Sequence, residues 1–189
     1  RREGVSGRGG HGAGGRGGPV VVCGGKRDQE LANHSVRALA PDGHGRALAI
    51  VGGRSLSRRA PDGVWSTIAT AEFDLACCVA IGGVVYVGTD DAHVLRVSAG
   101  GEMEQLSGFD GVAGRDRWYA GGAVIGGKRV GPPPGFRSIA SPSAGEVLLA
   151  NVPVDGIPRS APRCVAWEPT HPLARTAPAL PGPPPRPTP

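Results

Sequence analysis

The segment GRDRWY carries the residue types in this chain that are best suited to contact a ligand. Two arginines flank an aspartate and are followed directly by a tryptophan and a tyrosine. Guanidinium groups stack on aromatic rings and donate hydrogen bonds in a fixed fork, so this combination suits a sugar or a peptide strand. A solvated loop with one aromatic side chain anchored in the core is the alternative. We predict ligand contacts from Arg115, Asp116, Arg117, Trp118 and Tyr119.

The sequence contains no recognisable catalytic motif. It has no GxSxG, no P-loop and no GxGxxG that opens a helix. Asp90 and Asp91 are expected to begin a hairpin turn, where aspartate is favoured for its backbone tolerance. Asp110 lies near the start of an insert and forms no convincing carboxylate pair. We therefore predict no catalytic residue, and the sequence favours a protein that is not an enzyme.

Cysteine and histidine spacing does not indicate a metal site. The four cysteines are Cys23, Cys77, Cys78 and Cys164, without a CxxC pair, and the five histidines are scattered. Neighbouring residues of a strand point to opposite faces, so Cys77 and Cys78 are expected to be small buried side chains. A vicinal redox pair is the alternative. No metal and no cofactor are predicted.

The net charge of +5 comes from the two ends of the chain. Residues 1–34 carry a net charge of +3, residues 169–189 carry +2, and the segment between them is neutral. A basic groove on a folded domain is therefore not expected, and a nucleic-acid partner is not favoured. Two RGG triplets, Arg8–Gly10 and Arg16–Gly18, leave RNA binding through the N-terminal segment as an alternative.

Both ends have compositions typical of disorder. Residues 1–34 are rich in Gly and Arg, and residues 169–189 contain nine prolines. We expect a disordered segment at each end. The sequence shows neither a long apolar run nor a signal peptide, so no membrane partner is predicted and a cytoplasmic location is favoured. The sequence that follows WEPT is rich in Pro, Ala and Arg, so a truncated or frame-damaged product is a further alternative.

Short apolar runs separated by turn residues repeat three times along the middle of the chain. The repeats cover residues 35–68, 73–107 and 136–168, and the insert 108–135 separates the last two. Four short strands in each unit of roughly 35–45 residues are typical of a β-propeller blade. We predict an all-β fold, a partial β-propeller of about three four-stranded antiparallel blades in residues 35–168. Because a propeller needs at least about four blades to close, self-association could supply the missing ones.

The repeated stretch resembles the BNR/Asp-box family of propellers, the sialidase-like group. The family marker, S-x-D-x-G-x-[TS]-W, lies in the turn between the third and fourth strands of a blade. Ser160 and Trp167 have its Ser-to-Trp spacing, although Pro162 stands at the Asp position, and Asp62 with Trp65 looks like a shortened box. The resemblance implies structural roles for these four residues in turns and packing, not catalysis.

The function that the resemblance implies is a non-catalytic repeat scaffold, which binds a protein or a glycan through loops at the mouth of the propeller. The alternative is a sialidase-like glycoside hydrolase relative whose catalytic residues lie outside this sequence or are lost. Its Phe-Arg-Ile-Pro motif does not occur here: Ile157-Pro158-Arg159 places the arginine after the proline.

Overall fold

Short β-strands form most of the regular structure in this computed structural model. It describes residues 4–6, 20–23, 26–113, 115, 123–126, 128–130, 135–142, 147–152, 157–160 and 166–169. Four of the five expected ligand contacts, at positions 116–119, and the Pro-rich segment from residue 170 onward lie outside these ranges. No helix within them is long and apolar enough to span a membrane.

Three four-stranded antiparallel sheets dominate the described part of the chain, and in each of them the strands pair in chain order. Blade 1 consists of β4 (Val36–Pro41), β5 (Ala47–Val51), β6 (Ser55–Arg59) and β7 (Trp65–Thr70). Blade 2 consists of β8 (Leu75–Ile81), β9 (Val84–Thr89), β10 (Val94–Val97) and β11 (Met103–Gln105). Blade 3 consists of β14 (Ser138–Ala140), β15 (Leu149–Asn151), β16 (Pro158–Ser160) and β17 (Trp167–Pro169).

The inner strands are apolar at successive positions because both of their faces are buried. Four residues in a row are buried in β5, and the same is true of β8. A half-exposed strand would alternate apolar and polar side chains. The runs ALAIV and LACCVAI therefore predict sheets that are covered on both sides, as blades stacked face to face are.

Two hydrophobic cores join the three blades. Leu48 and Ile50 of blade 1 pack with Leu75 and Val87 of blade 2 in the first core. The second core lies between blades 2 and 3. Its largest side chains are Phe109, Phe136 and Trp167, and the Phe109 ring centroid lies 5.0 Å from that of Phe136 and 4.9 Å from that of Trp167.

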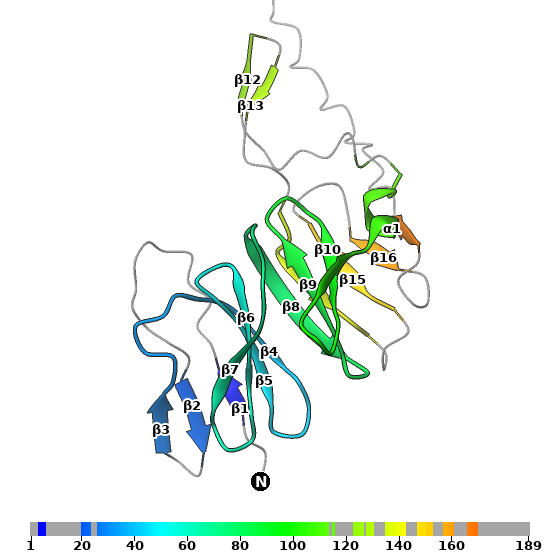
Figure 1. Ribbon diagram of the computed structural model, residues 1–189. Helices are drawn as coiled ribbons and strands as arrows, with labels where there is room; N and C mark the ends of the chain where they lie inside the picture. The colour runs from blue at the N-terminus through cyan, green and yellow to red at the C-terminus, as the bar shows by residue number, and fades with distance from the viewer. Residues whose placement is uncertain are drawn as a thin grey trace, which may run out of the picture.

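The first strands of the three blades lie next to one another, since β8 contacts both β4 and β14. Figure 1 shows the green sheet of blade 2 between the blue-to-cyan blade 1 and the yellow-to-orange blade 3. This arrangement, with the first strand innermost and the sheets fanned outward, is that of propeller blades. The described residues form a partial β-propeller with three four-stranded antiparallel blades.

The N-terminal segment differs from our expectation of disorder over residues 1–34. Within it, β1 (Gly4–Ser6), β2 (Val20–Cys23) and β3 (Lys26–Gln29) form a three-stranded antiparallel sheet. The run VVVC explains this sheet, because β-branched residues favour paired strands even beside a Gly-rich stretch. The average composition of residues 1–34 does not reveal this run. The insert between blades 2 and 3 contains the short helix α1 (Ser107–Asp110) and the hairpin of β12 (Ala123–Ile125) and β13 (Lys128–Val130).

Gly88 in β9 of blade 2 lies in close contact with Phe136 at the entry to blade 3. An added Cβ at this position would lie 2.5 Å from Cγ of Phe136 and 2.9 Å from Sγ of Cys77. Real Cβ atoms do not come so close to their neighbours. Glycine is therefore required here by the closeness of the contact, and not by a positive φ angle.

Candidate functional site

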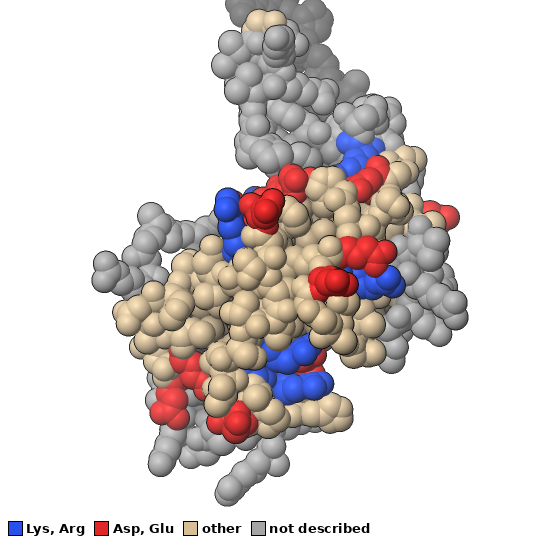
Figure 2. Space-filling model, viewed as in Figure 1, with Lys and Arg blue, Asp and Glu red and all other residues tan. Residues whose placement is uncertain are grey.

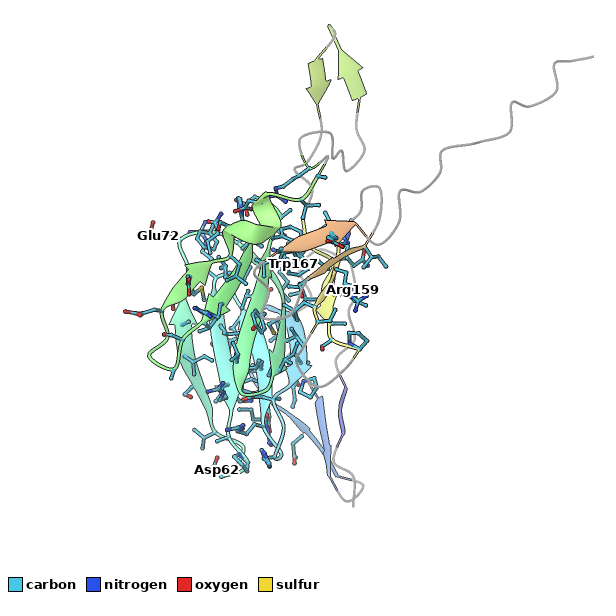
Figure 3. All side chains as sticks on the ribbon, turned by 90° about the vertical axis from the view of Figure 1, so that its right-hand side faces the viewer. Asp62, Glu72, Arg159 and Trp167 are labelled. Carbon is cyan, nitrogen blue, oxygen red and sulfur yellow. The ribbon has the colours of Figure 1, made fainter. Side chains whose placement is uncertain are left out.

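The loops at one end of the blades form the candidate site, which we call the mouth. It comprises residues 35–37, 52–54, 71–74, 90–93, 106–113, 115 and 135–137, which begin the first strands or follow the second and fourth strands. The turn of blade 1 that contains the Asp-box-like Asp62 lies at the opposite end. Figure 3 shows this separation in blade 1, where Glu72 and Asp62 occupy opposite ends of the sheet.

A bidentate ion pair joins blades 1 and 2 at the mouth. Nη1 of Arg37 donates a hydrogen bond of 2.6 Å to Oδ2 of Asp90, and Nη2 donates to Oδ1. The two residues are 53 positions apart in the sequence, and each side chain is 39% exposed. The fork geometry fixes their relative orientation, while solvent can still reach both groups.

Asp90 lies where the three blades meet. Its backbone N–H donates to the carbonyl of Asp74, at the entry to blade 2. On the other side, an added Cβ at Gly135 would lie 2.6 Å from the carbonyl oxygen of Asp90, just before blade 3 begins. A second ion pair, with Nε of Arg54 3.1 Å from Oδ1 of Asp74, links two neighbouring mouth loops.

A polar cluster around Asp110 covers the outer part of the mouth on blade 2. Nδ1 of His93 lies 2.7 Å from Oδ1 of Asp110, and Nε2 of Gln105 donates to Oδ2 at 2.7 Å. Nη2 of Arg115 lies 3.4 Å from Oδ1. The β9–β10 turn itself is held by Thr89, whose fully buried hydroxyl accepts a hydrogen bond from the His93 N–H. Asp110 thus ties the start of the insert to blade 2.

Arg115 is the expected ligand contact that the structure describes, and it lies at the mouth. Its guanidinium carbon is 5.2 Å from the centroid of the Phe109 ring. Burial lowers the pKa of Arg115, and the nearby Asp110 opposes this shift. The side chain therefore spans the core and the mouth. Asp116, Arg117, Trp118 and Tyr119 follow it outside the described residues.

The Asp-box-like residues of blade 1 lie in and beside a turn away from the mouth. Oδ1 of Asp62 accepts a hydrogen bond of 3.1 Å from the N–H of Val64, which stabilises the turn. Nε1 of Trp65 donates to Oε2 of Glu30 at 2.6 Å. Glu30 also accepts two hydrogen bonds of 2.8 Å from Arg59. Sequence reasoning missed Glu30, because no local spacing relates it to partners about 30 positions away.

The corresponding residues of blade 3 have structural contacts as well. Oγ of Ser160 accepts a buried hydrogen bond of 2.8 Å from the N–H of Leu148 and so joins β16 to the strand before it. Trp167 is buried in the second core, where Phe109 packs against it edge to face. The Trp167 contact thus helps to position blade 3 against blade 2, whereas the Ser160 contact lies within blade 3.

We expect the Glu30→Gln variant to unfold more easily than the natural chain by about 1–3 kcal/mol near neutral pH, because charged hydrogen bonds to Arg59 and Trp65 are weakened. Hydrogen bonds from Arg59 hold the pKa of Glu30 below its ordinary value of 4.5, although burial opposes them. A carboxyl with a lowered folded pKa contributes stability above its unfolded pKa and loses it as the pH falls through the folded value. The difference between the two proteins should therefore shrink below about pH 4.5 in urea unfolding followed by fluorescence. A difference that does not change with pH would contradict this role.

The two adjacent cysteines lie in different cores: Cys77 faces blade 3, and Cys78 faces blade 1. Both are free thiols, and burial raises the pKa of each to about 12. The thiolate is the reactive form of cysteine, so neither residue is suited to redox chemistry at neutral pH. The described residues also contain no group of three or more His, Cys, Asp or Glu side chains that could hold a metal ion.

We expect both thiols to resist iodoacetamide in the folded chain near pH 8, and to react readily once urea unfolds it. Peptide mapping by mass spectrometry after timed labelling would measure each rate separately. Rates at least about a hundredfold slower in the folded chain would agree with thiols of such high pKa. Comparable rates in the two states would show that the blade contacts open often.

Comparisons with solved structures place this fold among propellers. YCF48 from Cyanidioschyzon merolae has a TM-score of 0.56 and 15% identity, over 82% of this chain and 49% of YCF48. The extracellular domain of BT4673 from B. thetaiotaomicron has a TM-score of 0.55 and 13% identity, over 85% of this chain and 20% of that protein. A structure of YCF48 bound to D1 peptide is also similar, with a TM-score of 0.49 and 14% identity, over 82% of this chain and 52% of that one.

The chain thus spans about half the length of YCF48. No family model matches the sequence, and no curated protein matches it either. Identities of 12–15% show a shared fold and no more. The TM-scores of 0.56 and 0.55, together with the three stacked antiparallel sheets, show that this chain has the fold of a partial β-propeller of the kind seen in YCF48 and BT4673.

Proposed function

We propose that the chain is a non-catalytic propeller scaffold that binds a peptide segment of another protein at its mouth. The observation that carries the proposal is the Arg37–Asp90 ion pair, which presents a partly exposed cation and anion at the point where the blades meet. Loops held by rigid sheets are the usual location of binding residues. An acidic side chain of a peptide can bind Arg37 and a basic one can bind Asp90, and neither exchange requires the strands beneath the pair to move.

The partners of the mouth carboxylates support binding over catalysis. Asp90, Asp74 and Asp110 each have an arginine within ion-pair distance. The oxygen atoms of these carboxylates are therefore already engaged by guanidinium groups, and such charged pairs suit the recognition of charged side chains. These residues are therefore arranged to hold loops and to meet opposite charges.

The direct test is to pan a displayed peptide library against the immobilised full chain and to measure the affinity of the enriched peptides. We expect enrichment, and binding at least about tenfold weaker for Arg37→Ala, which corresponds to about 1.4 kcal/mol. Arg159→Ala is the matched control, because Arg159 is an exposed arginine on β16 of blade 3, opposite Glu168 in the strand register, whereas the Arg37–Asp90 pair joins blades 1 and 2.

Two outcomes would contradict the proposal. In the first, no peptide is enriched, or the enriched peptides bind the Arg37→Ala variant unchanged. In the second, the chain hydrolyses an aryl sialoside, which would favour the glycoside hydrolase alternative. Thermal melts of both variants followed by circular dichroism would show that each one is folded before its affinity is compared.

A further inference from the structure

A groove separates blades 1 and 2 at the end opposite the mouth. Its volume is about 800 Å³. Arg58 and Ile68 line it from blade 1, while Val85, Val97 and Met103 line it from blade 2. The size lies within the range of ordinary binding sites. The groove shares no residue with the mouth, so it is a separate surface.

The apolar lining of the groove is only partly covered. Ile68 and Met103 are half-buried and pack against the core between the two blades. The β10–β11 turn bounds the groove through Ser98, Ala99 and Glu102. This turn packs closely against blade 1, because an added Cβ at Gly101 would lie 2.2 Å from the carbonyl oxygen of Ile68. Covering the parts of the Ile68 and Met103 side chains that remain exposed would bury further apolar surface, which is favourable.

The blade 1 side of the groove has an excess of positive charge. Nε of Arg58 lies 2.7 Å from Oδ2 of Asp42, and Nε of Arg46 lies 3.6 Å from the same oxygen. The Asp42 side chain is only 3% exposed, whereas those of Arg58 and Arg46 are 32% and 37% exposed. Arg58 and Arg46 share the single carboxylate of Asp42, so this group of three residues has a net charge of +1 that solvent can reach.

The blade 2 side of the groove carries no such surplus of positive charge. Arg96 is paired with Glu104, and Glu102 lies exposed at the rim. Figure 2 shows basic side chains gathered between the lower ends of blades 1 and 2, beside a tan surface, with acidic side chains farther up on blade 2. The field across the groove therefore favours a ligand with its anion toward blade 1.

We propose that this groove docks an extended peptide segment in which an acidic side chain neighbours an aliphatic one. The carboxylate takes up the surplus charge of Arg58 and Arg46, and the aliphatic side chain covers Ile68 and Met103. Charge complementarity on the blade 1 side selects this partner, since a basic side chain placed there would meet the guanidinium groups of Arg58 and its neighbour Arg46. The proposal concerns a second surface and holds whether or not the mouth binds a peptide.

The chain offers a single reporter for the test, because Met103 is its only methionine. Labelling methionine with ¹³C in the methyl group gives one NMR signal inside the groove. The probes are three capped synthetic peptides: one of alternating Glu and Leu, one of alternating Lys and Leu, and one of alternating Glu and Ser. We expect a saturable shift of the Met103 signal with the Glu/Leu peptide and much weaker effects with the other two.

Variants of the two arginines separate this site from the mouth. Arg58→Gln and Arg46→Gln should each weaken binding of the Glu/Leu peptide by roughly fivefold or more, since each removes the surplus charge. Arg46→Gln leaves the Arg58–Asp42 contact in place, so it remains informative if Arg58→Gln fails to fold. Arg37→Gln, at the mouth, is the control and should leave the affinity unchanged.

The proposal is overturned if the Met103 signal does not move up to millimolar Glu/Leu peptide, or moves equally with the Lys/Leu peptide. It is also overturned if Arg46→Gln binds as tightly as the natural chain. A loss of binding in Arg37→Gln alone would place the peptide at the mouth and not in the groove.

Discussion

Replacing Gly88 with alanine is expected to destabilise the chain by about 1–3 kcal/mol or more, as overpacking of a well-packed core does. The new methyl group would lie 2.5 Å from Cγ and 2.8 Å from Cβ of Phe136, and 2.9 Å from Sγ of Cys77. Relief requires Phe136 to move, and Phe136 packs against Phe109. Urea unfolding followed by circular dichroism would measure the loss.

Gly100→Ala is the matched control for this substitution. Gly100 has no positive φ angle, and an added Cβ would meet nothing closer than Oγ of Ser98 at 3.7 Å. The control should therefore change the free energy of unfolding by about 0.5 kcal/mol or less, as surface substitutions usually do. Equal effects of the two substitutions would mean that blades 2 and 3 are not in contact at Gly88.

Replacing Phe109 with alanine is expected to have the largest effect of all, a loss of about 3–5 kcal/mol. Phe109 is fully buried, and its ring contacts Phe136 of the blade 3 entry and Trp167 of β17. Aromatic pairs of this kind add to the energy of burial itself. The same ring lies under the Arg115 guanidinium, so the mouth cluster should loosen together with the core.

Phe73→Ala provides the control for Phe109→Ala. Phe73 is 42% exposed in a mouth loop, and its removal should cost about 1 kcal/mol or less. Denaturant midpoints of the two variants should therefore differ clearly. A small effect of Phe109→Ala would show that α1 does not hold blades 2 and 3 together.

The repeated pattern of short apolar runs predicted the fold well, because each blade encodes its strands locally. Runs such as ALAIV and VVYVGT are bounded by glycine or aspartate turns, and the structure places β5 and β9 there. Strand pairing in chain order needs no long-range information. The small β1–β3 sheet was missed because average composition hid a run of three valines.

The candidate site was predicted far less completely, because its contacts are long-range. Arg37 and Asp90 are 53 positions apart, and nothing in either local sequence indicates that they meet. His93 and Asp110, which lie 17 positions apart, form a contact only because the insert folds back onto blade 2. The expected contact GRDRWY was chosen from local composition, and Arg115 is the part of it that the structure describes.

Amide hydrogen exchange with a library-selected peptide tests the central claim, peptide binding at the mouth, most directly. Exchange would be measured by mass spectrometry on the full chain with and without saturating peptide. We expect slower exchange in the mouth loops, residues 52–54, 90–93 and 106–113, and little change in the turn 60–64 at the opposite end. Protection confined to that turn, or no protection at saturating peptide, would contradict the claim.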